Sequence, residues 1–165
     1  MADVIVLNPV DFITIGTIGP KGKRVFYLQA GYDRQLVSLV IEKEQSWALS
    51  EAINEMIDDL DDRYDLDGDA DDDPDMDLRE PIQPMFRVSQ MGLGYDEDQD
   101  KIVLVAQELV VQRPDEDEDD IEDPGVVRLY CTREQMRALS QQALDTVNSG
   151  RADPKQNGRL VYYWT

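Results

Sequence analysis

Residues 36–50 of the chain read LVSLVIEKEQSWALS, and residues 126–140 read VVRLYCTREQMRALS. Aligned at an offset of 90 positions, the two stretches are identical at seven of fifteen positions. Each begins with β-branched and apolar residues typical of a strand and passes directly into a helical pattern. The identities are Val37/Val127, Leu39/Leu129, Glu44/Glu134, Gln45/Gln135, Ala48/Ala138, Leu49/Leu139 and Ser50/Ser140. This likeness predicts two copies of one supersecondary unit.

The segments upstream of these two stretches are also alike. Residues 11–19, DFITIGTIG, resemble residues 85–94, MFRVSQMGLG, in the leading phenylalanine and the late glycines. Residues 24–30 resemble residues 101–109. Each half then contains three strands followed by one helix. The strands are expected at 11–18, 24–30, 36–42, 85–94, 101–111 and 125–131.

The sequence therefore predicts an α+β fold built from internally duplicated βββα units, with antiparallel sheets and two helices related by a pseudo-twofold axis. Most strands are apolar on both faces, so they are covered on both faces or packed against a second sheet. Closure into a barrel is left open. The 165 residues suit a single domain. Its expected parts are a first half at 11–64, an acidic loop at 58–80, a second half at 85–150 with an acidic loop at 114–124, and an extension at 151–165.

The helix starts carry polar residues suited to capping. Thr132 with Gln135 three residues on matches a capping box. Glu44 and Glu134 stand in the two first turns, where the helix dipole favours a carboxylate. The same two glutamates are candidates for an acid–base pair only if the fold brings them close enough to shift one pKa. The structural role is the favoured interpretation.

The repeat also predicts which helical residues face the core. Leu49 and Leu139 are equivalent at the offset of 90, and both are expected to face the sheet. If their neighbours Ser50 and Ser140 face solvent, replacing them by alanine is expected to be nearly neutral.

The acidity of the chain is concentrated in two tracts. The chain has 36 acidic and 16 basic residues, and 58–77 and 115–123 hold twenty of the acids. The rest is nearly neutral, so the tracts are expected to be solvated loops or, alternatively, docking sites for a basic protein or mimics of nucleic acid. They oppose binding of nucleic acid. With Gly68 at the sixth position of an EF-hand loop, Arg63 and Pro74 would stand where ligands are needed, so no calcium site is predicted.

The glycine-rich stretch GTIGPKGKR at 16–24 is not a phosphate-binding loop. Gly22-Lys23 is followed by Arg24 rather than Ser or Thr, and Thr17 stands where the first glycine is required. The residues on both sides read as strands, so the stretch is expected to form the tip of a β-hairpin.

Other features indicate a cytoplasmic protein without catalytic machinery. No signal peptide or membrane-spanning run is indicated. The chain has no histidine and a single cysteine, Cys131, which excludes an internal disulfide and a Cys-His pair. Cys131 precedes a helix N-terminus, which could lower a thiol pKa, but a buried apolar role is favoured. No cofactor or metal is expected.

Five polar residues interrupt otherwise apolar strands: Arg24, Gln29, Glu42, Arg87 and Gln107. In one interpretation they satisfy strand ends and helix N-termini, with Gln29 and Gln107 in like positions of the two halves. In the other, a cleft between the halves is lined by Tyr27, Gln29, Arg87 and Gln107 and orients a small ligand.

Several segments together resemble an uncharacterised bacterial family, domain of unknown function 3090. They are GTIGPKGKRVFYLQA (16–30), VSLVIEKEQ (37–45), FRVSQMGLGYD (86–96) and NSGR (148–151). The resemblance implies a cytoplasmic protein of no established activity, often encoded beside a histidine-phosphatase-like and a kinase-like protein, either of which is then a candidate partner.

The chain departs from the family pattern near its C-terminal end. Relatives typically carry a C-x-x-C-G hairpin, a histidine and a further cysteine there, which resembles a structural zinc site. Here Arg151 runs through ADPKQ to Asn157-Gly158. The zinc-type hairpin is missing, so the resemblance implies no zinc in this chain. Ser89 and Tyr95 also replace the usual glycine and tryptophan.

Together these features predict a non-enzymatic protein-interaction module. The alternative is a small-molecule sensor or enzyme that uses the cleft between the halves. The sequence does not indicate an oligomeric state.

Overall fold

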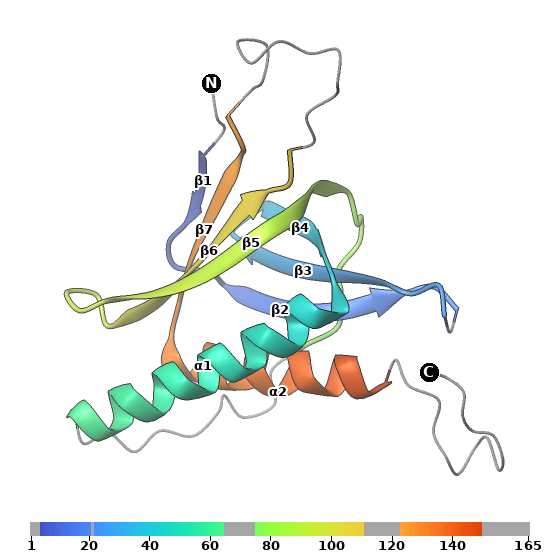
Figure 1. Ribbon diagram of the computed structural model, residues 1–165. Helices are drawn as coiled ribbons and strands as arrows, with labels where there is room; N and C mark the ends of the chain where they lie inside the picture. The colour runs from blue at the N-terminus through green and yellow to red at the C-terminus, as the bar shows by residue number, and fades with distance from the viewer. Residues whose placement is uncertain (1–3, 21, 65–74, 111–122, 150–165) are drawn as a thin grey trace, which may run out of the picture.

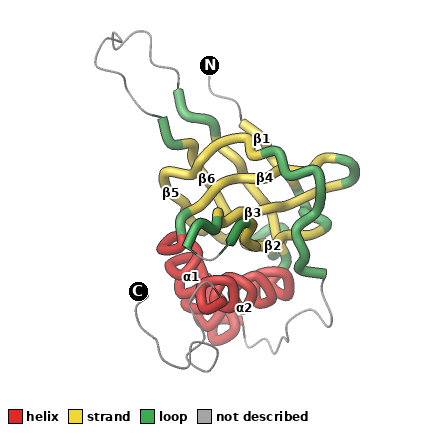
Figure 2. Tube along the Cα trace, turned by 90° about the vertical axis from the view of Figure 1, so that its right-hand side faces the viewer, coloured by secondary structure: helices red, strands yellow, loops and turns green. Residues whose placement is uncertain are grey.

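The computed structural model describes residues 4–20, 22–64, 75–110 and 123–149. One seven-stranded sheet, in the order β1-β7-β6-β5-β4-β3-β2, is covered by two helices that lie together on one side of it (Figures 1 and 2). The elements are β1 (Val4–Leu7), β2 (Phe12–Ile18), β3 (Val25–Tyr32), β4 (Gln35–Ile41), α1 (Lys43–Tyr64), β5 (Pro84–Asp96), β6 (Lys101–Glu108), β7 (Val126–Cys131) and α2 (Arg133–Ser149). The predicted α+β class is confirmed.

All six expected strands are present close to their expected bounds, and one strand was not expected. This strand, β1, has only four residues and ends before Asn8-Pro9. Its register pairs Val4 with Val126 and Leu7 with Leu129. A short apolar run next to a proline carries little local signal, because its stability depends on a partner far along the chain.

The prediction of antiparallel sheets is only partly correct, because the sheet is mixed. β4 pairs with β5, and β1 pairs with β7, in the parallel sense. The first of these pairs follows from connectivity, since α1 links β4 to β5 and a helical crossover returns the chain in the same direction. The remaining neighbours in the sheet are antiparallel.

Strand β5 joins two parts of the sheet that run in different directions. Its first residues, Pro84–Arg87, pair with β4, and Val88–Asp96 pair with β6, with an irregularity in each register. Figure 1 shows β1, β6 and β7 running across the direction of β2 and β3. At the far side, the Val10 N–H donates to the Tyr130 carbonyl (2.9 Å), so the two edges of the sheet approach each other there.

The glycine-rich stretch forms the predicted hairpin tip. β2 and β3 pair antiparallel from Phe12–Gly31 to Ile18–Val25. Between them, Gly19 (φ 114°) and Gly22 (φ 85°) adopt left-handed conformations, which favour glycine. The hairpin interpretation is therefore confirmed.

The two helices bury their apolar faces against the sheet and against each other. Leu49 and Leu139 are both buried in the hydrophobic core, as expected. The condition for a nearly neutral substitution of Ser50 and Ser140 is not met, since both are buried where α1 meets α2. Small hydroxyl side chains at this position let the two helices approach closely and satisfy each other's polar atoms. Neither helix, within the described residues, is long and apolar enough to cross a membrane.

Candidate functional site

The four residues expected to line a cleft lie on three strands. They are Tyr27 and Gln29 on β3, Arg87 on β5 and Gln107 on β6. Tyr27 pairs with Val40, which pairs in turn with Arg87, so Tyr27 and Arg87 share one face of the sheet with one strand between them. Gln107 lies on the other side of β5, where its side-chain carbonyl accepts a hydrogen bond from Gln90 Nε2 (2.6 Å).

Gln29 and Gln107 do not occupy like positions in the sheet. Gln29 pairs with Ser38. The residue 90 positions after Ser38 is Arg128, and it pairs with Val105 rather than with Gln107. The expected correspondence was based on similar sequence around the two glutamines, and the register of the sheet overrides it.

Both polar atoms of the Gln29 side chain are hydrogen-bonded inside the protein. It is buried, its Oε1 accepts a hydrogen bond from the Arg79 N–H (2.7 Å), and its Nε2 donates to the Arg79 carbonyl (2.8 Å). Nε2 also donates to Ser38 Oγ (3.1 Å). The amide thus pairs with a peptide group as a strand neighbour would, which supports the structural interpretation of this residue.

Gln29 belongs to a set of contacts that hold residues 75–83, here called the strap, against β2 and β3. Thr14 Oγ1 donates to the Met76 carbonyl (2.6 Å). Leu78 lies over Gly16, where an added Cβ would come within 2.7 Å of its Cγ. The Arg79 guanidinium stacks on the ring of Phe12 at 3.4 Å. Glycine at position 16 therefore leaves the room that Leu78 fills.

Part of the expected acidic loop at 58–80 belongs to α1 and to the strap. Of the expected loop at 58–80, residues 58–64 lie in α1 and residues 75–80 lie in the strap. The rest of that loop, 65–74, falls outside the described residues, as do residues 114–122 of the second acidic loop and the whole extension at 151–165.

Arg87 lines a hollow of about 350 Å³ beside the hairpin tip. Arg24, Lys43 and Gly22 also line it. The Arg87 guanidinium donates to the Glu42 carboxylate, which ties β5 to the start of α1. The cationic side of the hollow is therefore partly neutralised by the protein itself.

The residues considered for catalysis, Cys131, Glu44 and Glu134, do not form a reactive arrangement. Cys131 is buried, and burial raises its pKa to about 12, so the thiolate that a nucleophile requires is suppressed. Glu44 and Glu134 stand in the first turns of α1 and α2, and both are exposed. The described part of the chain holds no cluster of three or more side chains of the His, Cys, Asp and Glu types that could hold a metal.

One ionic cluster links the helices to the turn after β5. Arg133 Nη2 donates to Asp100 Oδ2 (2.6 Å), and Arg137 Nη2 donates to Asp61 Oδ1 (2.7 Å). Hydrogen bonding to Arg133 lowers the pKa of Asp100 against the opposing effect of burial, and Tyr95 adds a further bond. This cluster fixes the end of the β5–β6 hairpin to α2 and stabilises the ionised form of Asp100.

An apolar groove lies between α1 and β5 and was not anticipated from the sequence. It has a volume of about 260 Å³. The helix contributes Ala48, Leu49 and Ala52, and the strand contributes Met91 and Leu93. In Figure 1, α1 lies below β5 and runs in the same general direction.

Gln45 closes the start of this groove. Its Oε1 accepts a hydrogen bond from the Glu42 N–H (2.7 Å), while its Nε2 donates to the Val88 carbonyl (3.1 Å) and the Ser89 carbonyl (3.3 Å) of β5. Gln135 makes the corresponding contacts at the start of α2, to the Thr132 N–H and the Val10 carbonyl. One glutamine therefore both caps a helix and anchors it to a neighbouring segment.

Beyond this shared start, the two helices differ. On α2, Gln142 Nε2 donates to the Ile15 carbonyl of β2 (2.9 Å), and Thr146 Oγ1 lies 3.3 Å from the same oxygen. The residues 90 positions earlier, on α1, are Ala52 and Met56, and neither has a side-chain hydrogen-bond donor. The junction between α2 and β2 is thus bridged by further side chains, whereas the described residues of α1 beyond Gln45 form no such bridge to β5.

The sequence carried one signal for the groove. Ala48 and Ala52 are four residues apart, so they lie on one face of a helix, and both are exposed. Alanine is common on exposed helical surfaces, so the pattern alone does not identify a groove. The facing strand, β5, is required to define it.

The chain belongs to the family described as "Protein of unknown function (DUF3090)", whose sequence model matches residues 5–157. No curated protein and no solved structure matches the chain.

Proposed function

We propose that this member of the DUF3090 family is a non-enzymatic, cytoplasmic protein-interaction module that binds its partner in the groove between α1 and β5. The observation that carries this proposal is the groove itself: an apolar surface beside a strand edge, lined by Ala48, Ala52 and Met91. Apolar grooves bordered by polar residues are typical of surfaces that bind another polypeptide.

The chemistry of the described residues favours binding over catalysis. The raised pKa of Cys131 removes the one thiol as a nucleophile. Gln29, the most buried of the expected ligand-binding residues, uses both its oxygen and its nitrogen on Arg79. Catalysis by a general acid or base requires a titratable group aimed at a substrate position.

The alternative function, a small-molecule sensor or enzyme, has one observation in its favour. The hollow near the hairpin tip is lined by Arg24, Lys43 and Arg87 and has a volume of about 350 Å³. A small anion is the ligand that such a surface fits. Glu42 competes with it for Arg87, and for this reason we rank the interaction module first.

We further propose that the segments β2-β3-β4-α1 and β5-β6-β7-α2 are duplicated units. The seven identities at the offset of 90 support this. The equivalent roles of Gln45 and Gln135 and the reciprocal contact of Ser50 with Ser140 are consistent with it. If so, the α1–β5 and α2–β2 junctions were once similar, and the groove beside α1 reflects their later divergence.

Affinity capture from the native cell extract, followed by mass spectrometry, tests the interaction module. The protein is immobilised beside a control protein of similar net negative charge, which accounts for basic proteins retained by charge alone. We expect one protein, such as the phosphatase-like or kinase-like candidate, to be enriched in a near-stoichiometric amount at raised salt. Retention of the same proteins by both columns would contradict the proposal.

A further inference from the structure

One edge of β5 pairs with no strand over most of its length, within the part of the chain that the structure describes. Pro84–Arg87 pair with β4, and Val88–Asp96 pair with β6 alone. Opposite β6, the second edge of Val88–Asp96 runs beside α1 (Figure 1). Gln45 of α1 already donates to the carbonyls of Val88 and Ser89. The N–H and C=O groups farther along such an edge are able to pair with an added strand.

The side chains beside this edge leave room for a backbone. Ala48 and Ala52 present only methyl groups to the groove, and Gly92 has open space around its Cα where a Cβ would be built. A neighbouring strand lies roughly 4.8 Å from the strand it pairs with. Small residues on both walls are what such a close approach requires.

The apolar lining indicates the side chains that the added strand carries. Leu49, Met91 and Leu93 line the groove, and the last two are partly buried against the core. In a strand, alternate side chains point to opposite faces, so only every second residue meets this lining. An occupant with apolar residues at alternate positions therefore fits.

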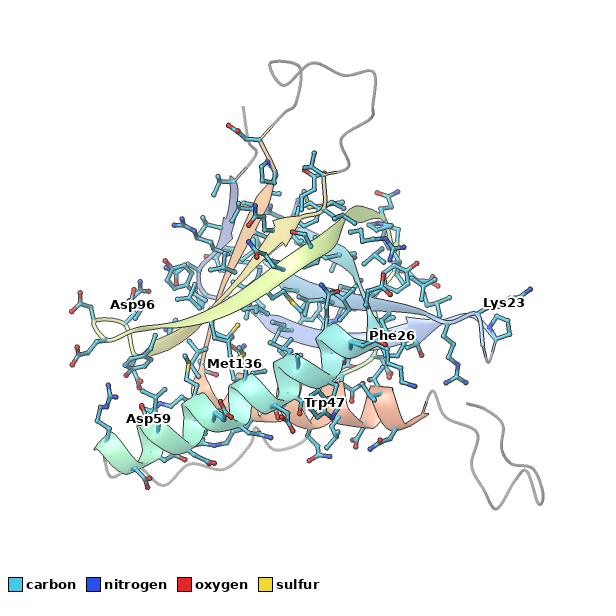
Figure 3. All side chains as sticks on the ribbon, viewed as in Figure 1. Lys23, Phe26, Trp47, Asp59, Asp96 and Met136 are labelled. Atoms are coloured by element: carbon cyan, nitrogen blue, oxygen red, sulfur yellow. The ribbon has the colours of Figure 1, made fainter. Side chains whose placement is uncertain are left out.

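The surroundings of the groove are acidic. Glu55 is exposed and lies on the same helical stripe as Ala48 and Ala52, at spacings of seven and three residues. Figure 3 shows Asp59 of α1 and Asp96 of β5 at the same end of the two elements. A partner with basic residues flanking its apolar positions complements this charge.

The junction between α2 and β2 shows how the same fold closes such an edge. There, Gln142 donates to the Ile15 carbonyl and occupies an acceptor that a strand would use. Ala52 stands at the corresponding position of α1, so beyond the carbonyls of Val88 and Ser89, which Gln45 occupies, no such side chain covers the edge of β5 within the described residues. The packing differs as well, because α2 lies against β2 more extensively than α1 lies against β5.

From these observations we infer that the groove binds an extended polypeptide segment, which adds to β5 as a strand and carries apolar residues at alternate positions and basic residues at its flanks. This inference deepens the proposed function and rests on it, since it names the mode of binding and the chemistry of the partner. The recognition is by main-chain hydrogen bonds to Gln90–Asp96 and by apolar contacts to Ala48 and Ala52.

The test uses random-sequence linear peptides displayed on phage and selected against the full-length protein. Selected peptides should share alternating apolar positions and basic flanks. Synthetic copies are then N-methylated at every second residue, in two sets of opposite parity. Strand addition predicts that one set binds at least about tenfold more weakly and the other nearly as well as the parent. Equal losses in both sets would overturn strand addition, as would failure to select any peptide.

The location is tested with Ala52→Gln, which introduces the side chain that closes the other junction. The matched control is Glu51→Gln, the same new side chain at the exposed neighbouring position. We expect Ala52→Gln to weaken peptide binding at least about tenfold and the control to change it less than about twofold. Ala48→Gln serves as a second groove variant if the first fails to fold. Equal binding by groove variants and control would overturn the location.

Two further measurements distinguish failure of the groove inference from failure of the proposed interaction function. A protein captured from extract equally well by wild type and Ala52→Gln would leave the interaction module intact and contradict the groove. Sedimentation equilibrium of the protein alone tests whether a second copy of the chain occupies the groove. A wild-type dimer that Ala52→Gln converts to monomer would place that second copy in the groove and overturn the inference of a separate basic segment.

Discussion

The hydroxyl oxygens of Ser50 and Ser140 lie 3.1 Å apart where α1 meets α2, and each hydroxyl is also within hydrogen-bonding distance of the other residue's carbonyl, at 2.9 and 3.2 Å. Both side chains are buried. The contact joins two residues that are 90 positions apart in the chain. The ends of the two similar sequence stretches, 36–50 and 126–140, therefore meet where α1 packs against α2.

Replacing either serine by alanine is expected to destabilise the protein. Each substitution removes a buried hydrogen bond and leaves polar atoms without a partner, at a cost of about 1–2 kcal/mol in the free energy of unfolding. The double variant Ser50→Ala/Ser140→Ala should cost less than the sum, because the two losses share one contact. Urea denaturation measures all three, with Glu51→Ala as an exposed control expected within about 0.5 kcal/mol.

The caps of the two helices are expected to respond differently. The Gln135 N–H donates to Thr132 Oγ1 (3.1 Å), so Thr132→Ala removes a capping acceptor and should cost about 1 kcal/mol. Glu42, at the corresponding position of α1, directs its carboxylate to Arg87 instead. Both partners of that ion pair are half exposed, so Glu42→Ala should cost under about 1 kcal/mol and less as salt rises. Thermal unfolding at low and high salt compares them.

Gln29→Ala is expected to release the strap. The substitution leaves the N–H and carbonyl of Arg79 without their partner, at a cost of about 1–3 kcal/mol. Trypsin should then cleave after Arg79 several-fold faster than in the wild type. Gln107→Ala is the control, since its side chain contacts Gln90 and not the strap. Unchanged cleavage in Gln29→Ala would show that the strap is held by other contacts.

Asp100 is expected to make stability depend on pH. Its pKa is lowered in the folded protein, chiefly by the hydrogen bond from Arg133. A carboxyl group of this kind stabilises the fold above its unfolded pKa of about 3.9, and the contribution is lost as the pH falls through the folded pKa. Asp100→Asn should therefore destabilise by under about 1 kcal/mol at neutral pH, and the difference should vanish in acid. Chemical denaturation across this pH range measures it, with Asp98→Asn as the control.

Local patterns in the sequence were sufficient for most secondary structure. The hairpin at Gly19 and Gly22 and the capping box at Thr132 each depend on residues close together in the chain, so sequence spacing predicts them. The parallel pairing of β4 with β5 and the short strand β1 depend on distant partners. No local pattern encodes those pairings.

The candidate site was harder to predict for the same reason. Gln29 was recognised as a buried polar residue, but its partner Arg79 is 50 residues away. The groove depends on Ala52 of α1 and Met91 of β5, each unremarkable alone. Only the packed structure shows that one helix leaves a strand edge open where the other helix, through Gln142, closes it.

Hydrogen exchange of the protein, alone and with its captured partner, tests the central claim most directly. If the partner adds a strand to β5, amides within Val88–Asp96 that face α1 should exchange more slowly in the complex, while those of β2, beside α2, stay unchanged. Protection that appears only around the hollow lined by Arg24 and Arg87, with none along β5, would contradict the account.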